Sequence, residues 1–146
     1  MTNTRPQPYA EDVNVGDELP ALLKVPTAVQ LFRYSAVTWN AHRIHFEPDY
    51  ARKEGHPDIL VQAHLHGAFL AQLVMDWAGP KARMTRFGWS NRGRAIPGDQ
   101  LRCSGTVVAK RYEDGKHLVD IELLETNQKS ETCAQGKATV SLPTRR

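Results

Sequence analysis

The most apolar stretch of the chain lies near its middle, between His64 and Trp77. Its apolar positions are Leu65, Ala68, Phe69, Leu70, Ala71, Leu73, Val74 and Trp77. Placed on a helix, they cover most of the circumference, so the pattern predicts a helix that is buried on several sides. The pair Gly79-Pro80 ends this helix, because both residue types break helical structure.

The part of the chain before this helix has weaker patterns. Residues 1–12 are polar and proline-rich, which predicts a loose arm, and residues 19–25 predict a strand. Thr27 can cap an amphipathic helix whose apolar residues recur at helical spacing up to Val37. Pro48 opens a short charged helix over residues 49–54.

After Pro80 the pattern changes to short apolar runs separated by turns. Strands are predicted at residues 84–89, 100–110, 116–125 and 131–142. One buried helix followed by a four-strand antiparallel meander is an α+β plan. Because the helix has little polar surface, the sheet must wrap around it, and this is the hot-dog fold. We expect a single domain over residues 1–146, with edge strands that pair between subunits of a dimer.

Composition narrows the class of protein. The chain has 146 residues, 40% of them hydrophobic and 24% charged, and a net charge of +3 that is spread along the sequence. This distribution argues against nucleic-acid binding. No run of about 18 apolar residues predicts a membrane span, and the N-terminus lacks the apolar core of a signal peptide. We therefore expect a cytoplasmic protein. Cys103 and Cys133 are expected to be buried free thiols.

Arginines gather between the long helix and the second predicted strand that follows it. They are Arg83, Arg86, Arg92, Arg94 and Arg102. A solvated strand face is the favoured explanation, and an anionic ligand such as a phosphorylated acyl carrier is the alternative.

The segment after the first helix is dense in amide and imidazole groups. His42 and His45 lie three residues apart, and Asn40 lies five residues before His45. Two histidines at this spacing can bind a metal, but no third ligand stands at a diagnostic spacing, so no metal site is predicted. An imidazole titrates near neutral pH, which suits His45 to either direction of proton transfer. The alternative is a partly buried histidine that only holds the fold.

A second group of candidates lies at the start of the long helix: His64, His66 and Gly67. The N–H of a glycine near a helix N-terminus can donate to a carbonyl oxygen, and the missing side chain lets that oxygen approach. Alternatively, Gly67 relieves crowding where strands pass the helix. With His45 as acid and base and the Gly67 N–H as oxyanion donor, an enoyl thioester can be hydrated. No cofactor is expected, since the sequence has no glycine-rich nucleotide loop.

The segment Tyr34-Ser35-Ala36-Val37-Thr38-Trp39-Asn40-Ala41-His42-Arg43-Ile44-His45-Phe46, followed by Tyr50-Ala51, resembles the hydratase motif of the MaoC-like family. These proteins are (R)-specific enoyl-CoA hydratases and 3-hydroxyacyl-thioester dehydratases with a hot-dog fold. The version here is most similar to the mesaconyl-CoA hydratase and type 2 hydroxyacyl-thioester dehydratase branch. The resemblance covers residues 13–142 and implies an acyl-CoA or acyl carrier protein thioester as substrate.

The resemblance also implies roles for individual residues. His45 matches the catalytic histidine, and Asn40 stands where the family has a catalytic aspartate. An amide cannot accept a proton from water, so we expect His45 to transfer protons and Asn40 to orient the water or substrate. His42 is expected to be a bystander at the pocket edge. The expected substrate-binding residues are Gly67, His66, His64, Trp39 and Arg43.

Two other functions compete with this hypothesis. The stretch 76–80, Asp-Trp-Ala-Gly-Pro, is similar to small MaoC-like subunits of steroid side-chain hydratases, which pair with a catalytic MaoC-like chain. The chain is therefore expected to form a homodimer or a heteromer, and a non-catalytic subunit is the first alternative. The second is a hot-dog acyl-CoA thioesterase. It is disfavoured, because Asp58 and Asp76 do not lie where such enzymes place their carboxylate.

Overall fold

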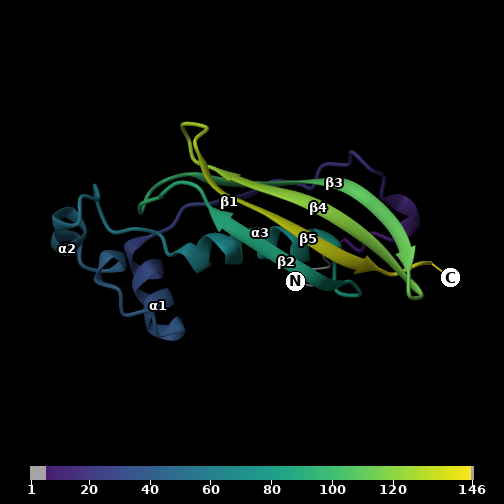
Figure 1. The fold of residues 1–146 in the computed structure, drawn as a ribbon, viewed down its shortest axis with the longest axis horizontal. Coiled ribbons are helices and arrows are strands. Elements are labelled where there is room, and N and C mark those ends of the chain that lie inside the picture. Colours follow the sequence, from purple (N-terminus) through teal and green to yellow (C-terminus); the bar gives the residue numbers. More distant parts are fainter. Residues whose placement is uncertain (1–5, 146) are drawn as a thin grey trace.

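The computed structural model describes residues 6–145. A five-stranded antiparallel sheet and one long helix make up most of it (Figure 1). The strands are β1 (Leu22–Lys24), β2 (Arg83–Asn91), β3 (Leu101–Glu113), β4 (Lys116–Thr126) and β5 (Thr132–Leu142). The helices are α1 (Ala28–Thr38), α2 (Pro48–Lys53) and α3 (Ala63–Ala78), with single 3₁₀ turns η1 (Ala10–Asp12) and η2 (Arg43–His45).

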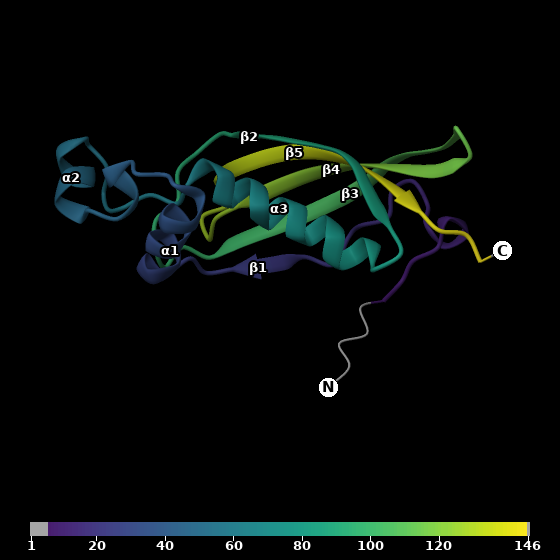
Figure 2. The ribbon, with the colours of Figure 1, turned by 90° about the horizontal axis from the view of Figure 1, so that it is seen from below.

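Helix α3 lies along one face of the sheet, as its apolar pattern predicts (Figure 2). Leu70 and Val74 are fully buried, and they belong to the same core as Ile121 of β4 and Val140 of β5. Burying one such side chain contributes about 1.5–3 kcal/mol. The curved sheet and the enclosed helix confirm the predicted α+β hot-dog fold.

The register of the sheet is set at the hairpin between β3 and β4. Asp114 and Gly115 are its two turn residues, and both have positive φ, +49° and +74°. This is the type I′ geometry whose twist matches that of the adjoining strands. The hairpin then places Val119, Ile121, Leu123 and Glu125 of β4 on the buried face.

Strand order differs from the predicted meander. The order is β1-β3-β4-β5-β2, so β2 pairs with β5 at one edge and not with β3. Strand β1 occupies the other edge and is shorter than predicted, Leu22–Lys24. Alternation along a strand reports which face is buried but not which strand lies beside it, and this explains why the sequence pattern missed the order.

The N-terminal segment is held to the domain more firmly than a loose arm. The Ala10 N–H donates to the Pro143 carbonyl at 2.9 Å, and the Lys110 Nζ donates to the Ala10 carbonyl at 2.8 Å. Val13 is buried in the core. Residues 1–5 of the predicted arm lie outside the described residues. In residues 6–145, no helix is long and apolar enough to cross a bilayer.

Helices α1 and α2 lie beyond the end of the sheet where α3 begins (Figures 1 and 2). Only Leu31 and Ser35 of α1 are buried, so most of this helix projects from the domain. The candidate motif occupies the connection from α1 through η2 to α2. It therefore lies at the same end of the molecule as the first turn of α3.

Candidate active site

His45 is the best-defined member of the site. It ends the single turn η2 and is only 8% exposed. Its Nδ1 lies 2.8 Å from the Leu60 carbonyl oxygen, and the Leu60 N–H donates back to the Ile44 carbonyl at 2.9 Å. A carbonyl only accepts hydrogen bonds, so the Nδ1 of His45 carries a proton. In the neutral ring the Nε2 then keeps its lone pair and can act as a base.

The surroundings of His45 favour that neutral form. Burial lowers the pKa of the His45 imidazole, the Leu60 carbonyl partly offsets this by raising the pKa, and charge on His42 lowers it further. Desolvation disfavours the charged ring because water no longer solvates it. His45 is therefore available as a proton acceptor at neutral pH.

Asn40 lies just past the end of α1. The helix stops at Trp39, whose backbone is left-handed with φ +58°, and the Asn40 N–H donates to the Ser35 carbonyl at 2.9 Å. The Asn40 Oδ1 accepts from the His42 N–H at 3.2 Å. Among the described residues, the Asn40 Nδ2 has no protein acceptor. The amide therefore has its Nδ2 donor and the second lone pair of its oxygen available to a substrate.

His42 and Arg43 lie on the open side of this segment. The His42 ring is exposed, and its centroid is 5.9 Å from that of His45 and 6.4 Å from that of Tyr50. Arg43 pairs with Glu47 through Nε at 2.9 Å and Nη2 at 2.5 Å, and its guanidinium lies 4.4 Å from the Tyr50 ring centroid. Arg43, expected at the substrate, thus has a carboxylate partner within its own segment.

His66 lies in the core and does not face solvent. It is 1% exposed, and its Nδ1 is hydrogen-bonded to Glu125, which is fully buried on β4. The other carboxylate oxygen of Glu125 accepts from the Cys103 Sγ at 3.5 Å. Burial and the neighbouring Glu125 raise the pKa of the Cys103 thiol. Burial raises the pKa of Cys133, also a free thiol, to about 11.

Sequence reasoning did not single out Glu125, although a signal was present. Glu125 continues the alternation Val119, Ile121, Leu123 on the inward face of its strand. A carboxylate at a core position of an alternating strand is unusual unless it has a partner. The strand pattern therefore marks Glu125 as buried, but only the fold identifies His66 as its partner.

Gly67 is the fifth residue of α3 and lies against Trp89 of β2. A Cβ at Gly67 would stand 2.5 Å from the Trp89 Cε2, and the Trp89 Nε1 donates to the Ala63 carbonyl at 3.1 Å. Close packing of an indole on the helix backbone therefore requires glycine here. His64, which is exposed, places its ring centroid 5.5 Å from that of Trp89.

Free backbone donors occur earlier in α3 than Gly67. The N–H groups of Leu65 and His66 donate to the Gln62 carbonyl at 2.9 and 3.2 Å. Those of Ala63 and His64 have no acceptor among the described residues, as expected at the start of a helix. The first turn of α3 thus offers two N–H groups to an acceptor outside the protein.

Gln62 connects the two halves of the site. Its side chain is fully buried, and its Nε2 donates to the Leu31 carbonyl at 2.7 Å and to the Ser35 Oγ at 2.9 Å. The Gln62 Oε1 has no partner among the described residues. These two bonds hold α1, which leads to Asn40, against the start of α3. The sequence carried no signal for this contact.

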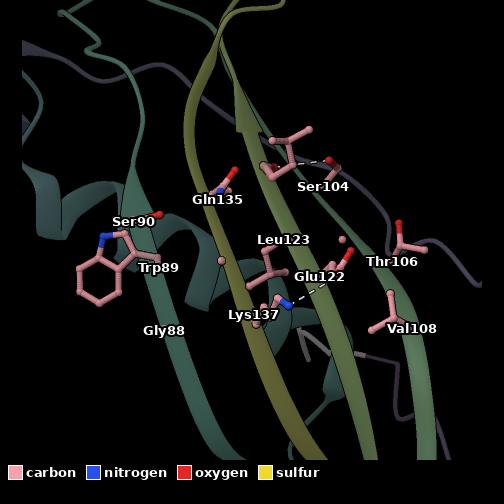
Figure 3. Close-up of a pocket in the computed structure, with 13 residues that line it drawn as sticks. Gly88, Trp89, Ser90, Ser104, Thr106, Val108, Glu122, Leu123, Gln135 and Lys137 are labelled. Carbon is pink, nitrogen blue, oxygen red and sulfur yellow. Dashed lines mark hydrogen bonds and ion pairs between the residues drawn. The ribbon is translucent and has the colours of Figure 1, made fainter.

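One pocket lies beside the candidate residues, and others lie on the outer face of the sheet. An apolar pocket of about 240 Å³ beside Asn40 is lined by Phe32, Ser35, Ala36, Trp39, Ala41 and Phe46. A larger pocket of about 800 Å³ lies on the face of the sheet that points away from α3, near Thr106, Glu122 and Lys137 (Figure 3). His45, His66 and Gly67 line neither pocket.

The remaining expectations concern metal ligands and the arginines. In residues 6–145, no group of three or more His, Cys, Asp or Glu side chains is placed to hold a metal ion. The five arginines of the cluster are all exposed, as a solvated face requires. One of them, Arg94, approaches His56, with its Nη1 at 3.2 Å from the Nδ1.

Comparison with known proteins identifies the family to which the chain belongs. The family model of type 2 hydroxyacyl-thioester dehydratases matches residues 6–97, more than half of the chain. The mesaconyl-C(4)-CoA hydratase of Chloroflexus aurantiacus is 42% identical over 72 residues, which are 49% of this chain and 24% of that protein. The chain therefore matches about a quarter of the length of this relative.

Solved structures show the same fold. The R-hydratase PhaJ1 of Pseudomonas aeruginosa, in its unliganded form, superposes with a TM-score of 0.84 at 18% identity, covering 94% of this chain and 86% of that one. The ChsH1-ChsH2 complex of Mycobacterium tuberculosis matches with a TM-score of 0.79 at 24% identity, covering 88% and 98%. These likenesses confirm the hot-dog fold, and the family match confirms the resemblance seen in the motif.

Proposed function

Because the chain belongs to the family of type 2 hydroxyacyl-thioester dehydratases, which is MaoC-like, we propose that it adds or removes water at the 2,3 position of an acyl thioester. The observation that supports this most directly is the geometry of His45. Its Nδ1–H is committed to the Leu60 carbonyl, which leaves the Nε2 as a base. Such a base can take the proton of water as the oxygen attacks the β-carbon.

The carbonyl of the thioester needs hydrogen-bond donors, because negative charge develops on its oxygen during the reaction. We propose that the first turn of α3 supplies them. The unpaired N–H groups of Ala63 and His64 lie in this turn. Gly67, the donor that the sequence indicates, is the fifth residue of α3, where the N–H bonds within the helix and Trp89 covers the backbone. The Asn40 Nδ2, which has no protein acceptor among the described residues, would orient the water or the substrate.

A second MaoC-like chain completes the site in this proposal. The projecting helix α1 exposes Val29, Phe32 and Val37, and the Trp39 side chain beyond it is 92% exposed. Trp39 also has a left-handed backbone, which a bulky residue rarely adopts without compensating contacts. Apolar exposure of this kind marks a binding surface. The structural relative ChsH1-ChsH2 is itself a complex of two chains.

A non-catalytic subunit remains the alternative, and the same open surface favours it. The two functions differ in whether the activity of the assembled protein depends on His45 of this chain. An active hydratase removes the enoyl absorbance of unsaturated acyl-CoA substrates without releasing free thiol, and His45→Gln abolishes that signal. With a non-catalytic subunit, the assembly keeps its activity when His45 is replaced by Gln, and a thioesterase releases thiol. A panel of enoyl-CoA substrates of different chain length, assayed for both signals, therefore tests the proposal.

A further inference from the structure

His42 is a second imidazole beside His45, on the open side of the same segment. The two ring centroids are 5.9 Å apart and the ring planes are inclined by 59°. His45 is 8% exposed, whereas His42 is exposed. One ring is thus held inside the domain, and the other, close to it, is open to solvent.

The backbone of His42 is held in place by the residue that departs from the family pattern. The Asn40 Oδ1 accepts the His42 N–H at 3.2 Å. One lone pair of the Asn40 oxygen is therefore bonded to the backbone, and as an amide Asn40 cannot take up a proton. The site has an amide in place of the family's carboxylate at this position, and an imidazole whose backbone is held two residues later.

Three carboxylates that follow His45 in the sequence are already engaged. Glu47 is paired with Arg43 through both its oxygens, and Asp49 is paired with Arg52 at 3.0 Å. The Asp58 Oδ1 accepts the Ile59 N–H at 2.8 Å. None of these three carboxylates is placed as a partner for His45 in the described residues.

Hydration of an enoyl thioester requires two proton transfers. Water loses a proton as its oxygen bonds to the β-carbon, and the α-carbon gains a proton as the carbon–carbon double bond is broken. No electrons leave or enter the substrate. One imidazole can perform both transfers in sequence, or two imidazoles can share them.

We propose that His42 is the second proton-transfer group of the site, with His45 as the base and His42 as the acid. This inference rests on the proposed hydratase function. The His45 Nε2 takes the proton from water, and the His42 ring delivers a proton to the α-carbon. His45 then returns its proton and His42 regains one through the solvent that His42 faces, so the cycle balances. In the dehydration direction the two roles exchange.

The charges around the pair are compatible with this division. Burial is the main cause that lowers the pKa of His45, and charge on His42 adds to it. Tyr50 from α2 faces the His42 ring, and the Leu60 carbonyl is hydrogen-bonded to the His45 ring. The Arg43 guanidinium, within its ion pair, lies over the Tyr50 ring.

The test compares His42→Gln with the wild-type chain, assembled with its partner if one is required for activity. The expected result is a fall in kcat/KM of about 100-fold, the lower bound for a lost acid or base. The wild type should show a bell-shaped pH profile of kcat/KM, and His42→Gln should lose the alkaline limb. Imidazole in the buffer should partly restore His42→Ala, since the site is open to solvent.

The matched control is His117→Gln, on β4 at the hairpin with β3 and outside the site, which should leave the profile unchanged. The inference is overturned if His42→Gln keeps wild-type kcat/KM, if the wild type has no alkaline limb, or if the variant loses activity but keeps that limb. The last result would assign His42 a structural role only. Failure of the hydratase proposal itself would instead appear as wild-type protein without hydratase activity in any assembly.

Discussion

Glu125 on β4 and His66 on α3 are hydrogen-bonded to each other inside the core, with 0% and 1% of their side chains exposed. This contact fixes the first turns of α3 against the sheet. The contact also explains why a histidine precedes Gly67: His66 is bonded inside the core and does not reach a substrate.

Replacing Glu125 by Gln should lower the free energy of unfolding by about 2–5 kcal/mol, because it removes one partner of a buried polar pair. Urea denaturation followed by circular dichroism measures this. Glu122→Gln is the control on the same strand. Glu122 is exposed, and its ion pair with the Lys137 Nζ, at 3.6 Å, is open to solvent. Removing its charge should therefore lower the free energy of unfolding by less than about 1 kcal/mol. Equal losses in the two variants would contradict the buried pair.

Gly67 makes a separate contribution to packing. Gly67→Ala should destabilise the fold by about 1–3 kcal/mol, because the added methyl group meets the Trp89 ring. Trp89→Leu should remove most of that penalty when combined with Gly67→Ala, and a double-mutant cycle on unfolding free energies measures the coupling. If the two changes are additive, the indole does not determine the requirement for glycine.

The catalytic pH dependence follows from the pKa of His45. Burial lowers this pKa below its usual value of about 6.5, so His45 stays neutral to lower pH than a free imidazole. The fall of kcat/KM at acid pH, which reports protonation of the base, should therefore have its midpoint below about pH 6.5. Folding stability should also decline as pH falls through this range, since the unfolded chain binds the proton more readily than the folded one. An acid limb above that pH would contradict the burial argument.

Much of the fold could be predicted from local patterns. The apolar residues of α3 identify the buried helix, and the residues at Asp114-Gly115 fit the turn between β3 and β4. Strand order could not be predicted, because alternation carries no information on which neighbour a strand takes. The structure was needed to place β2 beside β5.

The site divides in the same way. The local motif singled out His45, and the hydrogen bond to Leu60 supports its proposed role as a base. Contacts between segments that are distant in the sequence could not be predicted. The Gln62 side chain bonds to α1 across 31 and 27 residues, and Trp89 covers Gly67 from another element. Neither contact follows from spacing within one segment.

The central claim is that His45 transfers protons in the hydration of an acyl thioester while Asn40 only orients. Its most direct test is kcat/KM for enoyl-CoA hydration by wild type, His45→Gln and Asn40→Ala, with unfolding curves to confirm that each variant is folded. The account predicts a loss of at least about 100-fold for His45→Gln and a smaller loss for Asn40→Ala. Hydration by a folded His45→Gln variant at the wild-type rate would contradict it.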